Sequence, residues 1–328
     1  AQDLNPARLR LVERMIGARG RAIFVGDSYQ AIYGFTGADT RSMATIRTRL
    51  KADTLPLSIC YRCPPNHIEL VKRWPNPLPG RADGLLEWES GTGALFFEDE
   101  GGRQKTKLAA GDLVICRKNA PLVGLFLQLI RAKVPARIEG RGLAEQYADL
   151  AEDVLSACEA PEWREAVANV ELLPCLDEWQ RQKLDALEKR FGRESWIYEE
   201  ESKRLGDEVE VLAALWDFHA ERKGSQSAAA FRATLKDLFS EDHGQTKVVR
   251  LSSVHRAKGL EAQTVYWLGP QEHRVLKDDP EAMQQENNLE YVALTRSKHR
   301  LVIVGEPDPR LLLGLLPATS LYRRSRRS

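Results

Sequence analysis

Short apolar runs alternate with stretches of helical periodicity along much of the chain. Runs of buried-strand type predict strands at 22–25, 55–59, 112–116, 248–252, 264–268 and 300–304. Helical spacing of apolar residues predicts helices at 6–16, 64–74 and 119–132, the first of which starts with Asn5 as its cap. This order of elements is typical of an α/β domain with a parallel sheet, in which ligands bind at the carboxyl ends of the strands.

The pattern changes between Gly140 and Gly244, where strand-like runs disappear and helical periodicity continues. Two apolar stripes stand out, formed by Leu143, Tyr147, Leu150, Val154 and Cys158, and by Leu205, Val209, Leu212 and Trp216. Such stripes indicate plain packing between helices. The block is therefore predicted to be an all-helical subdomain inserted into the α/β domain.

Composition narrows the class of protein only slightly. A length of 328 residues suits about two domains, and 43% hydrophobic with 29% charged residues is typical of a soluble globular protein. The net charge of +1 gives no sign of a nucleic-acid partner, although a basic groove can exist on a neutral protein. Residues 316–328 form a basic tail that we expect to be a solvated end. No apolar run approaches the ~20 residues of a membrane span, so a cytoplasmic protein is expected.

The five cysteines argue against a disulfide framework and for a reducing compartment. Cys60 and Cys63 form a C-x-x-C pair, which by itself is compatible with zinc or redox chemistry. No second C-x-x-C and no nearby pair of histidines supplies further ligands. A zinc site is therefore not favoured.

Four segments carry a family resemblance: VGDSYQAIYGFTGA at 25–38, CYRC at 60–63, SVHRAKGLE at 253–261 and EYVALTRSK at 290–298. In this order they resemble the second half of a UvrD-like superfamily 1 DNA helicase. No G-x-x-x-x-G-K-[ST] phosphate loop occurs in the chain, and its start, AQD, resembles the end of the family's D-E-x-Q-D motif. The sequence is thus interpreted as a helicase cut inside its ATP site, with the Mg²⁺ ligands expected upstream.

The resemblance implies RecA-like lobes with a parallel sheet, which agrees with the α/β pattern. We expect a remnant of the first RecA-like lobe at 1–56, the second lobe at 57–140 and 246–315, the helical insertion at 141–245 and the tail at 316–328. Arg117 and Asn119 resemble a further segment of the second lobe, and we expect them to support the fold.

For the nucleotide, the resemblance implies three catalytic residues. Arg62 and Arg296 would act as arginine fingers that meet the charge developing on the γ-phosphate. Gln30 would sense the γ-phosphate and couple it to DNA, because an amide donates and accepts at once.

Four further residues are expected to bind ATP. Tyr61 stands at the family's base-stacking position, Glu261 at the position that holds the ribose hydroxyl, and Lys258 near phosphate. Gln2 is a second candidate for coupling. Cys60 and Cys63 depart from the family's usual Asn and Ser.

Single-stranded DNA binding requires aromatic platforms and phosphate donors. The resemblance implies stacking by Tyr33 and Phe35, and backbone contacts by Ser253 and His255. The family more often has Trp at Phe35 and Thr at Ser253.

The leading hypothesis is an ATP-dependent 3′→5′ single-strand DNA translocase and helicase with Mg²⁺ as cofactor. Its expected partners are single-stranded DNA, junctions of single- and double-stranded DNA, and the missing N-terminal half of the same protein. It would lie with the nucleoid, or in the nucleus of a eukaryote. The alternative is a non-hydrolysing DNA-binding or regulatory module derived from a helicase, and a third reading is a helical scaffold whose motifs are accidental.

Overall fold

The computed structural model describes residues 1–17, 20–34, 37–38, 41–57, 59–71, 84–139, 142–157, 172–222, 227–239, 248–269 and 280–305. The chain divides into two compact units, each described by itself below. Unit 1 comprises Ala1–Arg117 and the chain from Ser252 onward, and unit 2 comprises Lys118–Leu251.

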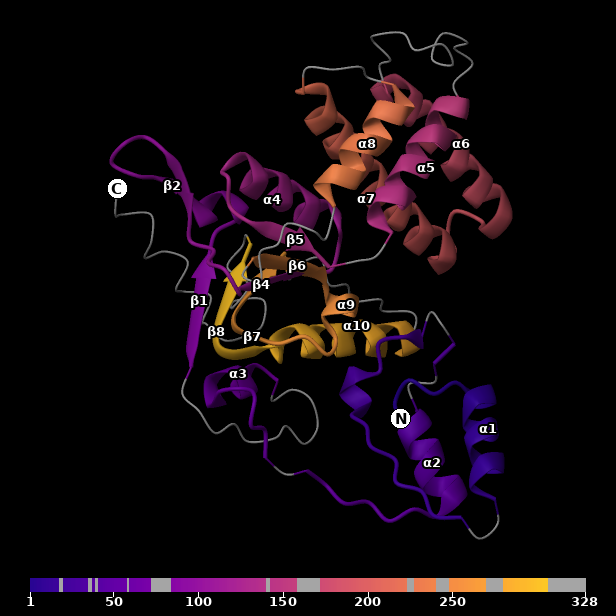
Figure 1. The fold of residues 1–328 in the computed structure, drawn as a ribbon. Helices are drawn as coiled ribbons and strands as arrows, with labels where there is room; N and C mark the ends of the chain where they lie inside the picture. The colour runs from indigo at the N-terminus through magenta and orange to yellow at the C-terminus, as the bar shows by residue number, and fades with distance from the viewer. Residues whose placement is uncertain are drawn as a thin grey trace. The chain divides into compact units, whose positions relative to one another are not determined.

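Six strands form one sheet among the described residues, in the order β1-β8-β7-β4-β6-β5 (Figure 1). They are β1 (Leu85–Glu89), β4 (Leu113–Cys116), β5 (Ala136–Ile138), β6 (Val249–Ser253), β7 (Ala262–Leu268) and β8 (Ser297–Val304). The pairs β1–β8, β8–β7, β7–β4 and β6–β5 are all parallel. The predicted α/β class with a RecA-like parallel sheet is confirmed, and so are the predicted strands at 112–116, 248–252, 264–268 and 300–304.

The core of unit 1 lies on one face of this sheet. Alternate positions of three neighbouring strands are fully buried there: Leu113 and Ile115, Val265 and Trp267, and Leu301 and Ile303. They pack against three helices, α3 (Pro65–Leu70), α9 (Val254–Ala257) and α10 (Pro280–Leu294). Figure 1 shows α10 running along the sheet. Unbroken apolar runs form such strands because both faces of a parallel sheet are covered.

The N-terminal part of unit 1 is helical. In α1 (Pro6–Ile16) the Asn5 side chain accepts a hydrogen bond from the Arg8 N–H at 2.7 Å, as predicted for its cap. The helix ends at Gly17, whose φ of 65° suits glycine. A short 3₁₀ turn, η1 (Ser28–Gln30), and α2 (Ser42–Leu50) follow.

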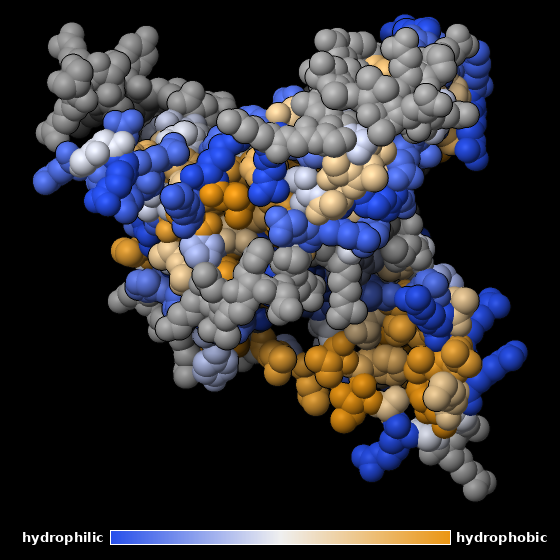
Figure 2. Space-filling model, turned by 45° about the horizontal axis from the view of Figure 1, so that its top comes forward, coloured by the Kyte–Doolittle hydropathy of each residue, from blue (hydrophilic) through white to orange (hydrophobic). Residues whose placement is uncertain are grey.

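Two predicted strands of this part are wrong. The described residues of 22–25 and 55–59 form no strand, and Ile23 and Leu55 are 92% and 90% exposed. A strand exists only when a neighbour takes up its backbone hydrogen bonds, and none of the described strands lies beside these segments. Figure 2 shows hydrophobic side chains on the surface in the region of the N-terminal helices.

Several small elements were not predicted from the sequence. They are the edge strands β1 and β5, the 3₁₀ turn η3 (Thr92–Leu95) and a separate hairpin of β2 (Phe96–Glu98) and β3 (Gln104–Thr106). Their polar residues hide the strand pattern.

Unit 2 contains α4 (Ala120–Arg131), α5 (Leu143–Ala157), α6 (Leu172–Phe191), α7 (Trp196–Ala220) and α8 (Ala228–Leu238). The helical block predicted for 140–244 is confirmed where the structure describes it, and the boundaries of the expected domains stay a prediction. On the two predicted stripes, Tyr147, Val154 and Leu212 are buried. Cys158 and the basic tail lie outside the described residues.

Cys175 on α6 is disulfide-bonded, whereas Cys60, Cys63 and Cys116 are free thiols. No described helix is both long enough and apolar enough to cross a lipid bilayer.

Candidate nucleotide and DNA site

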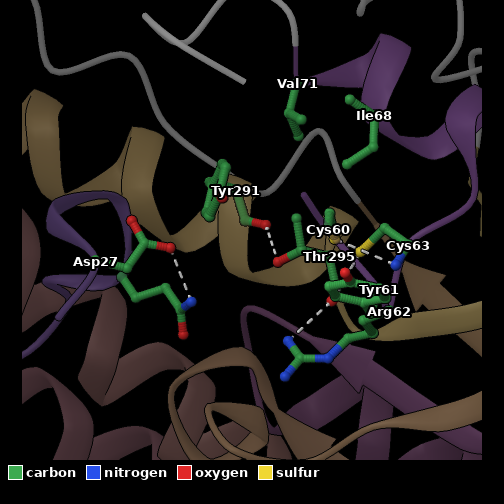
Figure 3. A pocket seen from close by; sticks show the side chains of 10 residues that line it. Asp27, Cys60, Tyr61, Arg62, Cys63, Ile68, Val71, Tyr291 and Thr295 are labelled. Atoms are coloured by element: carbon green, nitrogen blue, oxygen red, sulfur yellow. Dashed lines mark hydrogen bonds between the residues drawn. The ribbon is translucent and has the colours of Figure 1, made fainter. Parts of the chain in front are cut away.

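A pocket of about 300 Å³ opens in unit 1. It brings together the loop after 22–25, the C-x-x-C segment, α3 and the end of α10 (Figure 3). Its lining residues are Asp27, Gln30, Cys60, Tyr61, Arg62, Cys63, Ile68, Val71, Tyr291 and Thr295. Three predicted site residues, Gln30, Tyr61 and Arg62, thus line one cavity. Tyr61 is 73% exposed, so the cavity is open to solvent beside its ring.

Local hydrogen bonds hold the loop that carries Gln30. The Asp27 carboxylate accepts from the Tyr29 N–H at 3.0 Å and from the Gln30 side-chain amide at 2.9 Å. The Gln2 side-chain oxygen accepts from the Asp27 N–H at 3.4 Å. Gln2 therefore contacts the backbone of the loop that carries Gln30.

Arg62 and Arg296 meet at Thr295. Arg62 Nη1 donates to the Thr295 carbonyl at 3.5 Å, and Arg296 Nη2 donates to the Thr295 hydroxyl at 3.0 Å. Arg296 is 1% exposed, and its Nε donates to the Val292 carbonyl at 2.9 Å. Burial first, and repulsion from Arg62 second, lower the Arg296 pKa to about 10, so Arg296 still carries its charge at neutral pH.

Arg296 lies just beyond the end of a helix. Helix α10 ends at Leu294, and Arg296 lies in the turn before β8. The backbone must extend there because Ser297 already pairs with Ala262 of β7. The Thr295 hydroxyl donates to the Tyr291 carbonyl at 2.8 Å and so closes the last helical turn.

Glu261 lies between two cations at the edge of this cluster. Its carboxylate accepts from Arg62 Nε at 2.8 Å and forms an ion pair with Lys298 Nζ at 2.5 Å. The hydrogen bond from Lys298, followed by that from Arg62, lowers the Glu261 pKa below its ordinary value. Glu261 therefore orients Arg62 in this structure.

Lys258 connects the predicted nucleotide residues with the predicted DNA residues. Its ammonium group contacts both Asp3 carboxylate oxygens and donates to the Gln30 carbonyl, each at 2.7 Å. It also lies 4.8 Å from the centre of the Tyr33 ring, within cation–π range. The side chain is only 11% exposed.

Two of the predicted DNA residues are in direct contact. The Tyr33 hydroxyl donates to the His255 carbonyl at 3.1 Å. Burial, with a smaller contribution from Asp3, raises the Tyr33 pKa, so its hydroxyl stays protonated at neutral pH. Ser253 caps α9 by accepting from the Arg256 N–H at 3.4 Å. Phe35 lies outside the described residues.

Comparison with known proteins bears on this arrangement. A model of the UvrD/REP helicase N-terminal domain matches residues 1–51, and a model of the UvrD-like helicase C-terminal domain matches residues 154–306. The chain belongs to the UvrD-like helicase family. The four motifs of the sequence and the parallel sheet agree with this membership.

Two curated relatives are themselves named as helicases. DNA helicase II of Haemophilus influenzae is 21% identical, over 94% of this chain and 55% of its own length. The ATP-dependent DNA helicase UvrD2 of Mycobacterium tuberculosis is 25% identical, over 92% of this chain and 46% of its own length. The chain thus spans about half the length of these curated relatives.

In this UvrD-like chain, sequence reasoning missed Asn288. It is 1% exposed on α10 and donates to the Ser28 and Ala31 carbonyls at 3.2 and 2.8 Å, which fixes the Gln30 loop to the helix. A polar residue on a helix gives no sign in the sequence that its partners lie some 260 positions away.

The expected support from Arg117 takes the form of an ion pair. Arg117 Nη2 lies 2.8 Å from the Glu286 carboxylate on α10, and Arg117 Nε donates to the same carboxylate. The Asn119 N–H donates to the Asp207 carboxylate at 3.0 Å in unit 2. The described residues include no group of three or more His, Cys, Asp or Glu side chains that could hold a metal ion.

Proposed function

We propose that this chain is part of an ATP-dependent DNA helicase that translocates 3′→5′ along single-stranded DNA. The observation that carries the proposal is the meeting of Arg62 and Arg296 at Thr295, beside a pocket lined by Tyr61 and Gln30. A cavity lined by the cation Arg62 and an exposed aromatic ring, with the second cation Arg296 buried behind Thr295, suits a nucleoside triphosphate.

In this proposal each side chain has a separate role. Tyr61 stacks on the base, which needs only an exposed ring face. Arg62 supplies charge to the phosphates once it is released from Glu261, whereas buried Arg296 supplies a charge that the fold holds in place. A charge fixed before reaction costs no reorganisation when the phosphoryl group transfers.

The residues described do not provide a magnesium site. Asp27 is engaged by Tyr29 and Gln30, and Asp3 by Lys258. The chain also has no phosphate loop of the G-x-x-x-x-G-K-[ST] type. We therefore propose that the ligands of Mg²⁺ and the phosphate loop come from sequence outside these 328 residues, and that the isolated chain does not hydrolyse ATP.

Coupling to DNA follows the contacts of Lys258. A shift of the Gln30 loop acts on Lys258 through the Gln30 carbonyl, and Lys258 contacts the Tyr33 ring. Tyr33 is in turn bonded to the backbone of His255. Stacking of bases on Tyr33 and Phe35 and phosphate contacts from His255 and Ser253 would transmit this shift to the strand.

The exposed apolar side chains of the N-terminal part support a partner surface. Ile23, Val25 and Leu55 are at least 71% exposed, which is unusual for large apolar residues. We propose that the N-terminal half of the helicase pairs with these segments and completes the first lobe.

Nucleotide hydrolysis provides the test. The purified chain, with and without a single-stranded oligonucleotide, should release no phosphate above the Arg296→Ala variant. In a longer gene product that carries a phosphate loop, Arg62→Ala and Arg296→Ala should each lower DNA-stimulated kcat by about 10³–10⁵-fold. Arg131→Ala is the matched control, because Arg131 forms a similar pair with Glu221 outside the pocket.

Polarity is tested separately, with partial duplexes that carry either a 3′ or a 5′ single-stranded tail. Unwinding of the 3′-tailed substrate alone agrees with the proposal. DNA binding by the longer product without any hydrolysis would favour the non-hydrolysing module instead. Turnover by the isolated chain that stops with Arg296→Ala would contradict the proposed division of the ATP site.

A further inference from the structure

Two cysteines flank Tyr61 and Arg62 on the wall of the pocket. The Cys63 N–H donates to Cys60 Sγ at 3.3 Å, so the segment turns back on itself and brings the two residues together (Figure 3). Cys63 is 2% exposed, and its Sγ lies 3.5 Å from the Thr295 carbonyl oxygen. Cys60 is partly exposed, and neither residue is in a disulfide.

The two thiols differ in their readiness to ionise. Hydrogen bonding from the Cys63 side chain is the largest of the effects that lower the Cys60 pKa to about 5, and the neighbouring Arg62 adds to it. The same hydrogen bond, together with burial, raises the Cys63 pKa. A partly exposed thiolate beside a protonated thiol is the arrangement found in reactive C-x-x-C pairs.

We propose that Cys60 and Cys63 form an oxidation site at which a peroxide converts the two thiols into a disulfide. The Cys60 thiolate attacks one oxygen of hydrogen peroxide, the O–O bond breaks, and Cys60 sulfenic acid and hydroxide result. Cys63 Sγ then attacks Cys60 Sγ, the S–O bond breaks, and water leaves with the Cys63 proton. The hydroxide takes up the proton that Cys60 released when it ionised. The two thiols together lose two electrons, and one peroxide is reduced to two molecules of water.

The disulfide would alter the contacts of the two arginines. A bonded Cys63 has no proton left to offer the nearby Thr295 carbonyl, which also accepts from Arg62. The closed ring contains Tyr61 and Arg62 and fixes their backbone in one conformation. This consequence for nucleotide binding rests on the proposed function, whereas the thiol chemistry does not.

Peptide mass spectrometry reads the modification directly, because trypsin cleaves between the two cysteines after Arg62. Cys60 falls in the peptide 52–62 and Cys63 in the peptide 63–72. The purified chain is treated with hydrogen peroxide, blocked with an alkylating reagent and digested without reductant. We expect these two peptides to appear linked, two hydrogens lighter than their sum, and to separate after dithiothreitol.

Matched variants assign the two roles. In Cys63→Ser, peroxide should produce a sulfenic acid on Cys60 that dimedone traps. In Cys60→Ser, the buried Cys63 should react with the alkylating reagent only slowly. Buried Cys116 is the internal control and should stay unmodified. Between pH 8 and pH 6 the rate of Cys60 alkylation should fall less than about 2-fold, against roughly 75-fold for a thiol of ordinary pKa.

Two results would overturn the proposal. One is the absence of the linked peptide under peroxide while Cys60 remains open to alkylation, and the other is over-oxidation of Cys60 with Cys63 intact. Binding of a fluorescent ATP analogue to the longer gene product that carries a phosphate loop keeps the two proposals apart. A linked peptide without loss of analogue binding sinks the nucleotide role of Arg62 and Tyr61 but leaves the oxidation site standing.

Discussion

Two regions of unit 1 carry the same apolar pattern and differ completely in burial. In β7 and β8, Val265 and Leu301 are fully buried within the parallel sheet. In the segments 22–25 and 55–57, Ile23 and Leu57 are 92% and 78% exposed. An apolar run therefore makes a segment able to form a buried strand. Its burial also requires a neighbouring strand to pair with it and a helix to cover its face.

Truncating one leucine in each region tests most directly whether the two regions differ in burial. Leu301→Ala should lower the free energy of unfolding by about 2–5 kcal/mol, because it leaves a cavity between the sheet and α10. Leu57→Ala should change it by less than about 0.5 kcal/mol in the isolated chain. Urea denaturation of both variants measures the difference. A large loss in Leu57→Ala would mean that the segment is covered in solution, for example by a second copy.

A smaller effect is expected at the contact that ties the N-terminal part to the sheet region. Lys258→Met removes the ion pair with Asp3, in which the lysine is 11% exposed and the carboxylate 38%. We expect a loss of about 1 kcal/mol in unfolding free energy, reduced from the value of a fully buried pair by the exposure of Asp3.

Hydrogen exchange should locate this effect. Amides near Asp3 and Gln30 should exchange faster in Lys258→Met, while those of β7 and β8 keep their protection. Lys107→Met is the control, because its pair with Glu89 at 2.6 Å involves a lysine that is 40% exposed. Equal effects of the two substitutions would show that Lys258 does not anchor the N-terminal part.

The sequence predicts the buried strands well and the long-range contacts poorly. Runs such as 300–304 contain so many apolar residues that only a buried strand accommodates them. Strand β1 escaped notice because Glu87 and Glu89 interrupt its pattern, yet at the sheet edge Glu87 pairs with Arg300 at 2.6 Å.

The candidate site follows the same division. Motif order indicates Arg62 and Arg296 as a pair, but it gives no sign that one is buried and the other is held by Glu261. The contacts of Lys258 with Asp3 and of Asn288 with Ala31 join residues more than 250 positions apart. Such pairs depend on how the chain folds, because neither residue type has a local preference for the other.

The smallest expected effect concerns Glu261, which stands at the edge of the buried region and is 38% exposed. Its pKa is lowered in the folded state, so its contribution to stability is present above the ordinary carboxyl range. The contribution is lost as the pH falls through the lowered pKa.

Carboxyl NMR titration should show that Lys298→Met raises the Glu261 pKa more than Arg62→Met does, because the hydrogen bond from Lys298 contributes more to the lowering. In the longer gene product that carries a phosphate loop, a bound ATP analogue that draws Arg62 to its phosphates should raise the Glu261 pKa, and it should leave that pKa unchanged in the Arg62→Met variant. If the Glu261 pKa does not change when the nucleotide binds, in either form of the protein, Arg62 stays with Glu261. The pocket would then lack the cation that the proposed hydrolysis requires.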